Sequence, residues 1–199
     1  MNITELSTLM RENGVVGAGG AGFPSYAKLN EKADTIILNC AECEPLLKLH
    51  RQVLEKYAYE IMSTLESIAE AVGASHVIIA IKGSYKEAVE AVKAQLASFS
   101  KTEIGYLPEI YPAGDEVITI YETTGRVVPP GSLPIEVGVI VYNVETIYNV
   151  YRAMASQAPV TYKYITIAGE VKKPVTLKAP LGITYYELVQ LAGGATVED

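Results

Sequence analysis

A run of glycines is the part of this chain whose residue types and spacing best suit chemistry with an anion. The run carries no charge and consists of Gly17, Ala18, Gly19, Gly20, Ala21 and Gly22. Glycines allow backbone amides to approach an anion closely. An aromatic residue and a rigid turn residue, Phe23 and Pro24, follow directly and are unusual in a solvated linker. The run therefore favours a structured phosphate-binding loop over a flexible surface loop.

A second polar stretch follows the short apolar run Thr35–Leu38. It reads Asn39, Cys40, Ala41, Glu42, Cys43, Glu44 and Pro45. It places one amide and two carboxylates just beyond a predicted strand. A phosphate cradle combined with a polar, acidic rim is what a nucleotide or flavin site requires.

The glycine run also matches the G-x-G-x-x-G pattern through Gly17, Gly19 and Gly22. A dinucleotide fingerprint must follow a strand and open a helix. Here residues 4–12 are predicted to be helical, and Pro24 prevents a long helix from starting at the third glycine. The next predicted strand ends in Asn39 and not in an acidic ribose ligand. An ordinary dinucleotide-dependent dehydrogenase is therefore disfavoured.

Two cysteines, Cys40 and Cys43, form a C-x-x-C pair that suggests a redox dithiol or a metal site. Structural zinc and iron–sulfur clusters typically need four ligands. The only histidines are His50 and His76, and predicted helix or strand separates them from the cysteines. We expect no metal here and interpret the cysteines as small packed side chains, while a dithiol stays an alternative.

The composition narrows the function classes. The chain has 199 residues, 49% of them hydrophobic, and a formal net charge of −7, which makes nucleic acid an improbable partner. The first residues lack the basic and apolar regions of a signal peptide. The apolar runs have the length of strands and cannot span a bilayer. We expect a cytoplasmic protein with no direct membrane insertion.

Alternating strand-like and helix-like segments must position these residues. Predicted strands are Thr35–Asn39, His76–Lys82, Glu103–Tyr106 and Val137–Tyr142. Predicted helices cover residues 47–72, 85–97 with Ser84 as cap, 116–121 with Asp115 as cap, and about 143–156. This β-α-β repetition predicts an α/β fold with a mostly parallel sheet.

The character of the sequence changes near Ala158 and Pro159. The whole net negative charge falls in residues 1–159, whereas residues 160–199 are neutral. Two strands, 162–168 and 174–178, and a helix, 185–191, capped by Thr184, are predicted there. This is too small a core to stand alone, so we expect one domain over residues 1–158 and a truncated module over residues 159–199.

A third stretch completes a recognisable order of motifs. It covers residues 124–134 (TGRVVPPGSLP), 137–139 (VGV) and 143–146 (NVET). The three stretches together resemble the family of the Rnf complex C subunit over residues 14–199. That family is related to the flavin-bearing, NADH-binding subunit of respiratory complex I and to cobalamin reductase of propanediol-utilisation compartments. Residues 42–47 look closer to the branch that contains cobalamin reductase and proline-reductase-associated proteins.

The resemblance implies a Rossmann-like FMN-binding domain followed by part of a β-grasp, soluble-ligand-binding (SLBB) module. It implies hydride transfer from NADH to FMN and onward electron transfer to iron–sulfur centres that this chain does not contain. Partners would be NADH and redox proteins or other members of a complex, in the cytoplasm, beside a membrane complex or inside a microcompartment. A non-catalytic binding or scaffold module is the alternative.

The resemblance also assigns site residues. Cofactor-binding positions would be Gly17, Gly19, Gly20, Gly22, Phe23, Lys28, Asn39, Glu42, Asp115, Asn143 and Thr146, and catalytic positions would be Glu44 and Glu116. Phe23 would stack on the nicotinamide nucleotide, and Asn143 and Thr146 would hold the phosphate at a helix start. Ala41 departs from complex I relatives, which have aspartate there. Lys28 could instead be solvated, Asp115 only a cap, and Glu145 a first-turn residue that complements the helix dipole.

Overall fold

The computed structural model describes residues 1–20, 22–44 and 46–197. Its larger part, which we call the α/β unit, is built around a parallel sheet in the order β3-β2-β1-β4. The strands are β1 (Thr35–Asn39), β2 (His76–Lys82), β3 (Thr102–Leu107) and β4 (Val139–Asn143). Asn39 pairs with Ala80 on one side and Asn143 on the other, so β1, β2 and β4 end at one edge. The predicted α/β class with a parallel sheet is confirmed.

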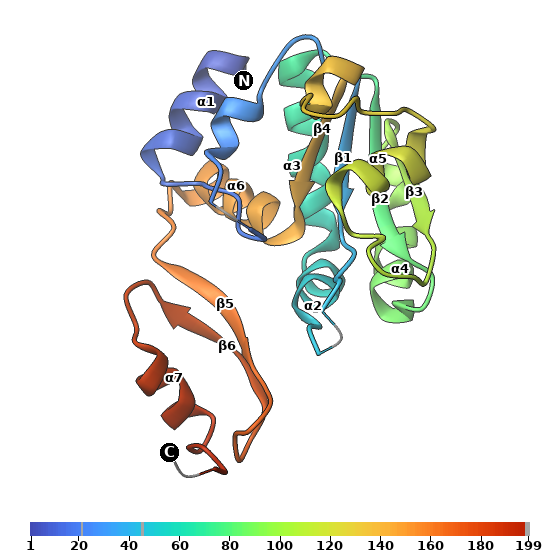
Figure 1. Ribbon diagram of the computed structural model, residues 1–199. Helices are drawn as coiled ribbons and strands as arrows, with labels where there is room; N and C mark the ends of the chain where they lie inside the picture. Colours follow the sequence, from blue (N-terminus) through green and yellow to red (C-terminus); the bar gives the residue numbers. More distant parts are fainter. Residues whose placement is uncertain (21, 45, 198–199) are drawn as a thin grey trace.

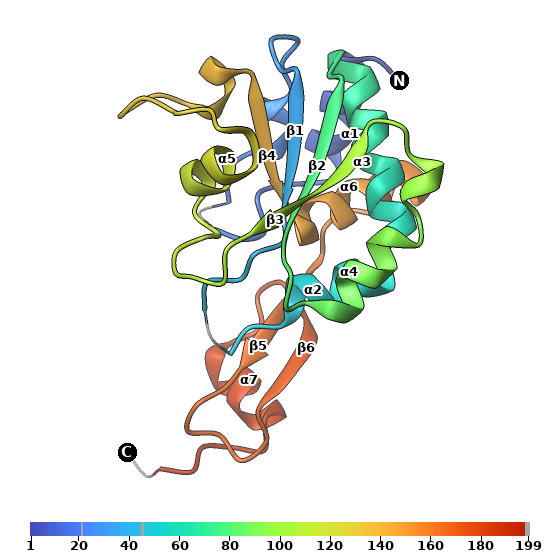
Figure 2. The ribbon, with the colours of Figure 1, turned by 90° about the vertical axis from the view of Figure 1, so that its right-hand side faces the viewer.

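Helices cover both faces of this sheet (Figures 1 and 2). The larger core lies between one face and α1 (Ile3–Glu12), α2 (Leu49–Lys56), α3 (Ala58–Val72), α4 (Lys86–Lys93) and α6 (Val144–Ser156). A smaller core lies on the other face against α5 (Glu116–Thr124). Ile36 and Leu38 face the larger core and Ile37 the smaller, so the middle of strand β1 is apolar on both faces.

Short 3-10 helices complete this part: η1 (Ser25–Lys28), η2 (Leu96–Ser98) and η3 (Pro134–Val137). The chain then forms an antiparallel pair, β5 (Tyr162–Ile167) and β6 (Val175–Pro180), followed by α7 (Tyr185–Leu191). Thr184 caps α7 as predicted, within a capping box completed by Glu187. This hairpin unit extends away from the α/β unit in Figure 1. Within the described residues, no helix has the length and apolar character needed to cross a membrane.

Two predicted helices differ from the structure. The single helix over residues 47–72 is wrong, because Tyr57, with φ −128° and ψ 34°, separates α2 from α3. The Tyr57 ring stacks on Tyr148 of α6, with ring centroids 4.4 Å apart. The helix over 85–97 is also wrong: α4 ends at Lys93, and its N-cap is Tyr85. Ser84 instead donates from its backbone N–H and hydroxyl to Glu109, each at 2.9 Å.

Candidate functional site

A cavity of about 500 Å³ lies at the carboxyl edge of the sheet, where β1 and β4 end. The glycine run, the residues after β1, the start of α2, Gly114 and the start of α6 line it. All predicted site residues except Asp115 contribute to this lining: Gly17, Gly19, Gly20, Gly22, Phe23, Lys28, Asn39, Glu42, Glu44, Glu116, Asn143 and Thr146. Segments far apart in the sequence are thus brought together around one space.

The described residues of the glycine run, which exclude Ala21, belong to a closed loop and not to a strand-to-helix turn. Its ends are joined because the Gly17 N–H donates to the Phe23 carbonyl at 2.8 Å. An isolated bridge between Val16 and Pro24 and a hydrogen bond from the Ser25 N–H to the Val15 carbonyl, at 3.3 Å, accompany it. The Ala18 N–H donates to the Thr146 hydroxyl at 2.9 Å, which ties the loop to the first turn of α6.

Gly19 is required by the close approach of the loop to Asn143. A Cβ at Gly19 would lie 2.7 Å from Nδ2 of Asn143. Asn143 is the N-cap of α6, and its Oδ1 accepts from the backbone N–H of Glu145 at 2.9 Å. The loop is therefore packed directly on a capped helix N-terminus, where the helix dipole favours an anion.

Asn39 joins two walls of the cavity. Its Nδ2 donates to the Gly114 carbonyl at 2.8 Å, and its Oδ1 accepts from the Ala41 N–H at 3.0 Å. A Cβ at Gly114 would lie 2.8 Å from Sγ of Cys43 and 2.9 Å from the Ala41 carbonyl oxygen. The polar stretch after β1 is thus held against the turn before α5.

An ion pair between Lys28 and Glu116 crosses the wall near β4. Nζ of Lys28 lies 2.9 Å from Oε1 of Glu116 and donates to the Val141 carbonyl at 2.8 Å. Lys28 is thus held by two protein contacts at the cavity wall, and its role in binding the cofactor stays a prediction. Asp115 accepts from the N–H groups of Val117 and Ile118 as the cap of α5, and does not line the cavity. A role for Asp115 in cofactor binding stays a prediction.

The two glutamates after β1 have different surroundings. Glu42 is buried, and its Oε1 accepts from the His50 N–H at 3.0 Å. Its Oε2 lies 3.5 Å from Nε of Arg51 and has no hydrogen-bond partner among the described residues. Burial raises the pKa of Glu42, and the His50 amide and the Arg51 charge oppose this rise. Glu44 is exposed at the cavity mouth.

His50 lines the cavity, but sequence reasoning considered it only as a metal ligand. Its Nε2 lies 2.9 Å from Nδ2 of Asn143. Burial and the charge of Lys163 lower the pKa of His50 to about 4, so the imidazole is neutral near pH 7. No motif marked this residue, because its contact with Asn143 arises only when α2 packs beside α6.

The two cysteines differ in burial. Cys40 is fully buried, and burial raises the pKa of its thiol, whereas Cys43 is partly exposed and lines the cavity. The expected absence of metal stays a prediction.

Strand β5 reaches the same region from the hairpin unit. Nζ of Lys163 donates to the Ala18 carbonyl and lies 3.1 Å from Oε2 of Glu145. Oε1 of Glu145 accepts from the Tyr164 N–H at 2.9 Å. Glu145 lies in the first turn of α6 as expected, but it is also a buried anchor for β5.

Known proteins resemble this chain in both sequence and fold. The model of the Nuo51 FMN-binding domain matches residues 10–152, and that of the SLBB domain matches residues 164–199. Cobalamin reductase PduS of Citrobacter freundii is 46% identical over 190 residues, covering 96% of this chain and 42% of the relative. The C subunit of the Na⁺-translocating ferredoxin:NAD⁺ oxidoreductase complex of Acetobacterium woodii is 31% identical over 203 residues, covering 100% and 46%.

A solved structure shares the fold. The crystal structure of NAD⁺-reducing [NiFe]-hydrogenase in the H₂-reduced state superposes with a TM-score of 0.82 at 23% identity, covering 98% of this chain and 40% of that one. The chain spans less than half the length of the curated relatives described above.

Proposed function

Because the chain belongs to the family of the Nuo51 FMN-binding domain, we propose that its cavity binds FMN and that the protein passes electrons from NADH through this flavin to a redox partner. The observation that supports this most strongly is the closed glycine loop packed on the capped N-terminus of α6. Gly19, Asn143 and the Ala18–Thr146 hydrogen bond build this contact. Such a site suits the single phosphate of FMN.

The residues present fit this cofactor. The cavity volume lies within the usual range of cofactor sites. Lys163 places a positive charge beside the loop and Lys28 places another at the opposite wall. Oε2 of Glu42 lies beside Nε of Arg51 but has no hydrogen-bond donor among the described residues, so it is an acceptor that a donor on the cofactor could satisfy. Asn39 and Gly114 would hold the walls at a fixed separation.

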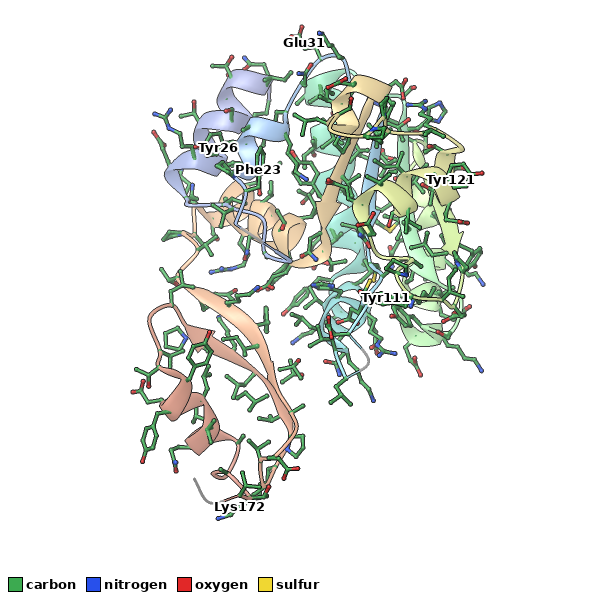
Figure 3. The ribbon with its side chains drawn as sticks, viewed as in Figure 1. Phe23, Tyr26, Glu31, Tyr111, Tyr121 and Lys172 are labelled. Carbon is green, nitrogen blue, oxygen red and sulfur yellow. The ribbon has the colours of Figure 1, made fainter. Side chains whose placement is uncertain are left out.

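Bound FMN would supply the redox chemistry, since a flavin accepts a hydride from NADH and releases electrons singly. The chain itself would bind, orient and shield the reacting rings. Phe23 is 51% exposed and borders both this cavity and a second, mainly apolar one of about 240 Å³. We assign NADH to the side where these cavities meet, between Phe23 and the Lys28–Glu116 pair (Figure 3 labels Phe23).

Flavin binding tests this proposal directly. The purified protein is titrated with FMN, FAD and riboflavin, and flavin fluorescence and absorbance are followed. We expect FMN to bind more tightly than FAD, because the glycine loop and the capped N-terminus of α6 together form a site for one phosphate. Anaerobic NADH should then bleach the bound flavin. Equal or tighter binding of FAD would contradict the FMN assignment.

The titration also distinguishes the proposed electron transfer from the alternative function. A non-catalytic binding module would retain the fold but would show neither a flavin spectrum nor bleaching by NADH. Binding of FMN without reduction by NADH would keep the cofactor assignment and overturn the choice of NADH as electron donor.

A further inference from the structure

We propose that His50 is a ligand of the FMN phosphate that takes up a proton when the cofactor binds, so that affinity for FMN increases as the pH falls. This inference rests on the FMN site proposed above. It concerns a side chain that borders the cavity beside the α6 cap.

The orientation of Asn143 determines what His50 can do. Oδ1 of Asn143 accepts from the N–H groups of Glu145 and Thr146, at 2.9 and 3.4 Å, so its Nδ2 must face His50. This Nδ2 is a donor that lies 2.9 Å from Nε2 and 3.5 Å from Nδ1 of His50, so we assign the nearer nitrogen, Nε2, as the unprotonated acceptor. The neutral ring then carries its proton on Nδ1.

The surroundings of His50 favour this neutral form. Burial and the positive charge of Lys163 from β5 both lower its pKa, to about 4. Glu42 approaches from the loop after β1, but its Oε1 accepts from the backbone N–H of His50. The other charged groups around α2 and the cavity include Lys48 before α2, Arg51, Glu55 and Lys56 on it, Lys178 on β6, Glu145 on α6, Glu87 on α4, and Lys28, Glu44 and Glu116 on the cavity walls.

A phosphate at the start of α6 would reverse this balance. A dianion close to an imidazole favours its charged form and raises its pKa. Protonation turns Nε2 into a donor, which can no longer accept from Asn143, so the ring would instead donate to a phosphate oxygen. The bound phosphate should thus return the pKa of His50 to its ordinary value of 6.5 or above.

The sign of the pH dependence follows from linkage. Because the pKa is higher in the complex than in the free protein, binding takes up a proton between about pH 4 and the pKa of the complex. The extra affinity is complete below about pH 4 and is lost as the pH rises through 6.5. Within this window the His50 contribution changes FMN affinity by up to about tenfold per pH unit.

The presence of only two histidines allows a direct measurement. Histidine side-chain NMR signals are titrated against pH in the free protein and with saturating FMN, riboflavin or inorganic phosphate. His76, exposed at the start of β2, is the internal control. We expect the pKa of His50 to rise from about 4 to at least 6.5 with FMN and to change little with riboflavin, which lacks the phosphate. A rise with inorganic phosphate alone would assign the effect to the phosphate group.

Two variants provide a second readout. H50Q keeps an acceptor for Asn143 but cannot be protonated, and H76Q is the matched control. Dissociation constants for FMN are measured from pH 5 to pH 7.5. The phosphate of FMN itself titrates near pH 6. The quantity compared is therefore the dissociation constant of H50Q divided by that of the wild-type protein at the same pH. This ratio should fall about tenfold or more as the pH rises, and it should stay constant for H76Q.

The outcomes separate this inference from the proposed function. Tight FMN binding with an unchanged pKa of His50, or a constant H50Q to wild-type ratio, would overturn the role of His50 and leave the FMN site intact. A complete absence of FMN binding at every pH would overturn both.

Discussion

Glu44 and Glu42 are two residues apart, yet only Glu44 lies exposed at the cavity mouth. We predict that Glu44→Gln slows flavin reduction by NADH about tenfold, which corresponds to roughly 1.4 kcal/mol of lost transition-state interaction. The affinity for FMN should change much less, because the proposed phosphate contacts come from the glycine loop, Asn143 and Thr146 and not from Glu44. Stopped-flow reduction and an FMN titration measure the two effects, and Glu12→Gln on the exposed face of α1 is the control. An unchanged reduction rate would refute the assignment.

The two cysteines should differ in reactivity. Cys40 is fully buried and the pKa of its thiol is raised, so the reactive thiolate is scarce there. Cys43 lines the cavity. We expect an alkylating reagent at neutral pH to modify Cys43 but not Cys40 in the folded protein, and FMN to protect Cys43. Mass spectrometry after digestion identifies the labelled residue.

The same cysteines should bind no metal. The double substitution Cys40→Ala, Cys43→Ala should retain FMN binding and reduction by NADH, because two thiolates leave a tetrahedral site half filled. Stoichiometric zinc or iron that disappears in the double variant would make the C-x-x-C pair functional.

Single residues also show what the sequence could and could not reveal. The glycine run, Asn39 and Asn143 could be predicted to share a site, because strand ends and loops of a parallel sheet gather at one edge. His50 could not be assigned a place in the cavity, since its contact with Asn143 depends on how α2 packs against α6. The Lys28–Glu116 pair joins residues that no local pattern connects.

At the scale of elements, the glycine loop and α6 act as one unit. Gly19→Ala would place a Cβ 2.7 Å from Nδ2 of Asn143, whereas a Cβ at Gly20 has nothing within 4 Å. We predict that Gly19→Ala lowers the free energy of unfolding of the cofactor-free protein by about 1–3 kcal/mol, in the range of overpacking. Gly20→Ala should change it by far less. Urea unfolding compares the two, and equal effects would show that the Asn143 contact is unimportant.

Strands and helix starts could be predicted from the sequence where neighbouring residues alone determine them. Continuous apolar, β-branched runs predicted three buried strands, and Asp115 and Thr184 predicted two helix starts. The break at Tyr57 was missed because the apolar spacing continues through it, and the ring stacks on Tyr148, which is distant in the sequence. The cap and the end of α4 were predicted wrongly, because Ser84 bonds Glu109, 25 residues further along the chain, and the helix ends at Lys93.

At the scale of the whole molecule, a lysine of the hairpin unit contacts the glycine loop. Lys163 on β5 joins the Ala18 carbonyl to the buried carboxylate of Glu145. The loop, α6 and β5 thus share one hydrogen-bonded network, because Thr146 also accepts from the Ala18 N–H. The position of the hairpin unit and the shape of the cofactor loop should therefore depend on each other.

This dependence gives a final prediction. Lys163→Met would leave Glu145, whose side chain is 2% exposed, without its cation. We expect a loss of about 1–3 kcal/mol in the free energy of unfolding, the cost of an uncompensated buried acceptor. This is below the range for a fully buried ion pair, because the Lys163 side chain is 42% exposed. Affinity for FMN should fall as well, since the Ala18 carbonyl loses its donor.

A double-mutant cycle distinguishes the effect of losing the Lys163–Glu145 contact from the effect of removing a positive charge. Lys163→Met combined with Glu145→Gln should lose less stability than the sum of the single changes, because the neutral amide needs no cation and its oxygen can still accept from the Tyr164 N–H. Lys172→Met, at the far end of the hairpin unit (Figure 3), is the control for removing a positive charge. If Lys163→Met and Lys172→Met weaken FMN binding equally, long-range charge and not the contact with Ala18 links the hairpin unit to the cofactor loop.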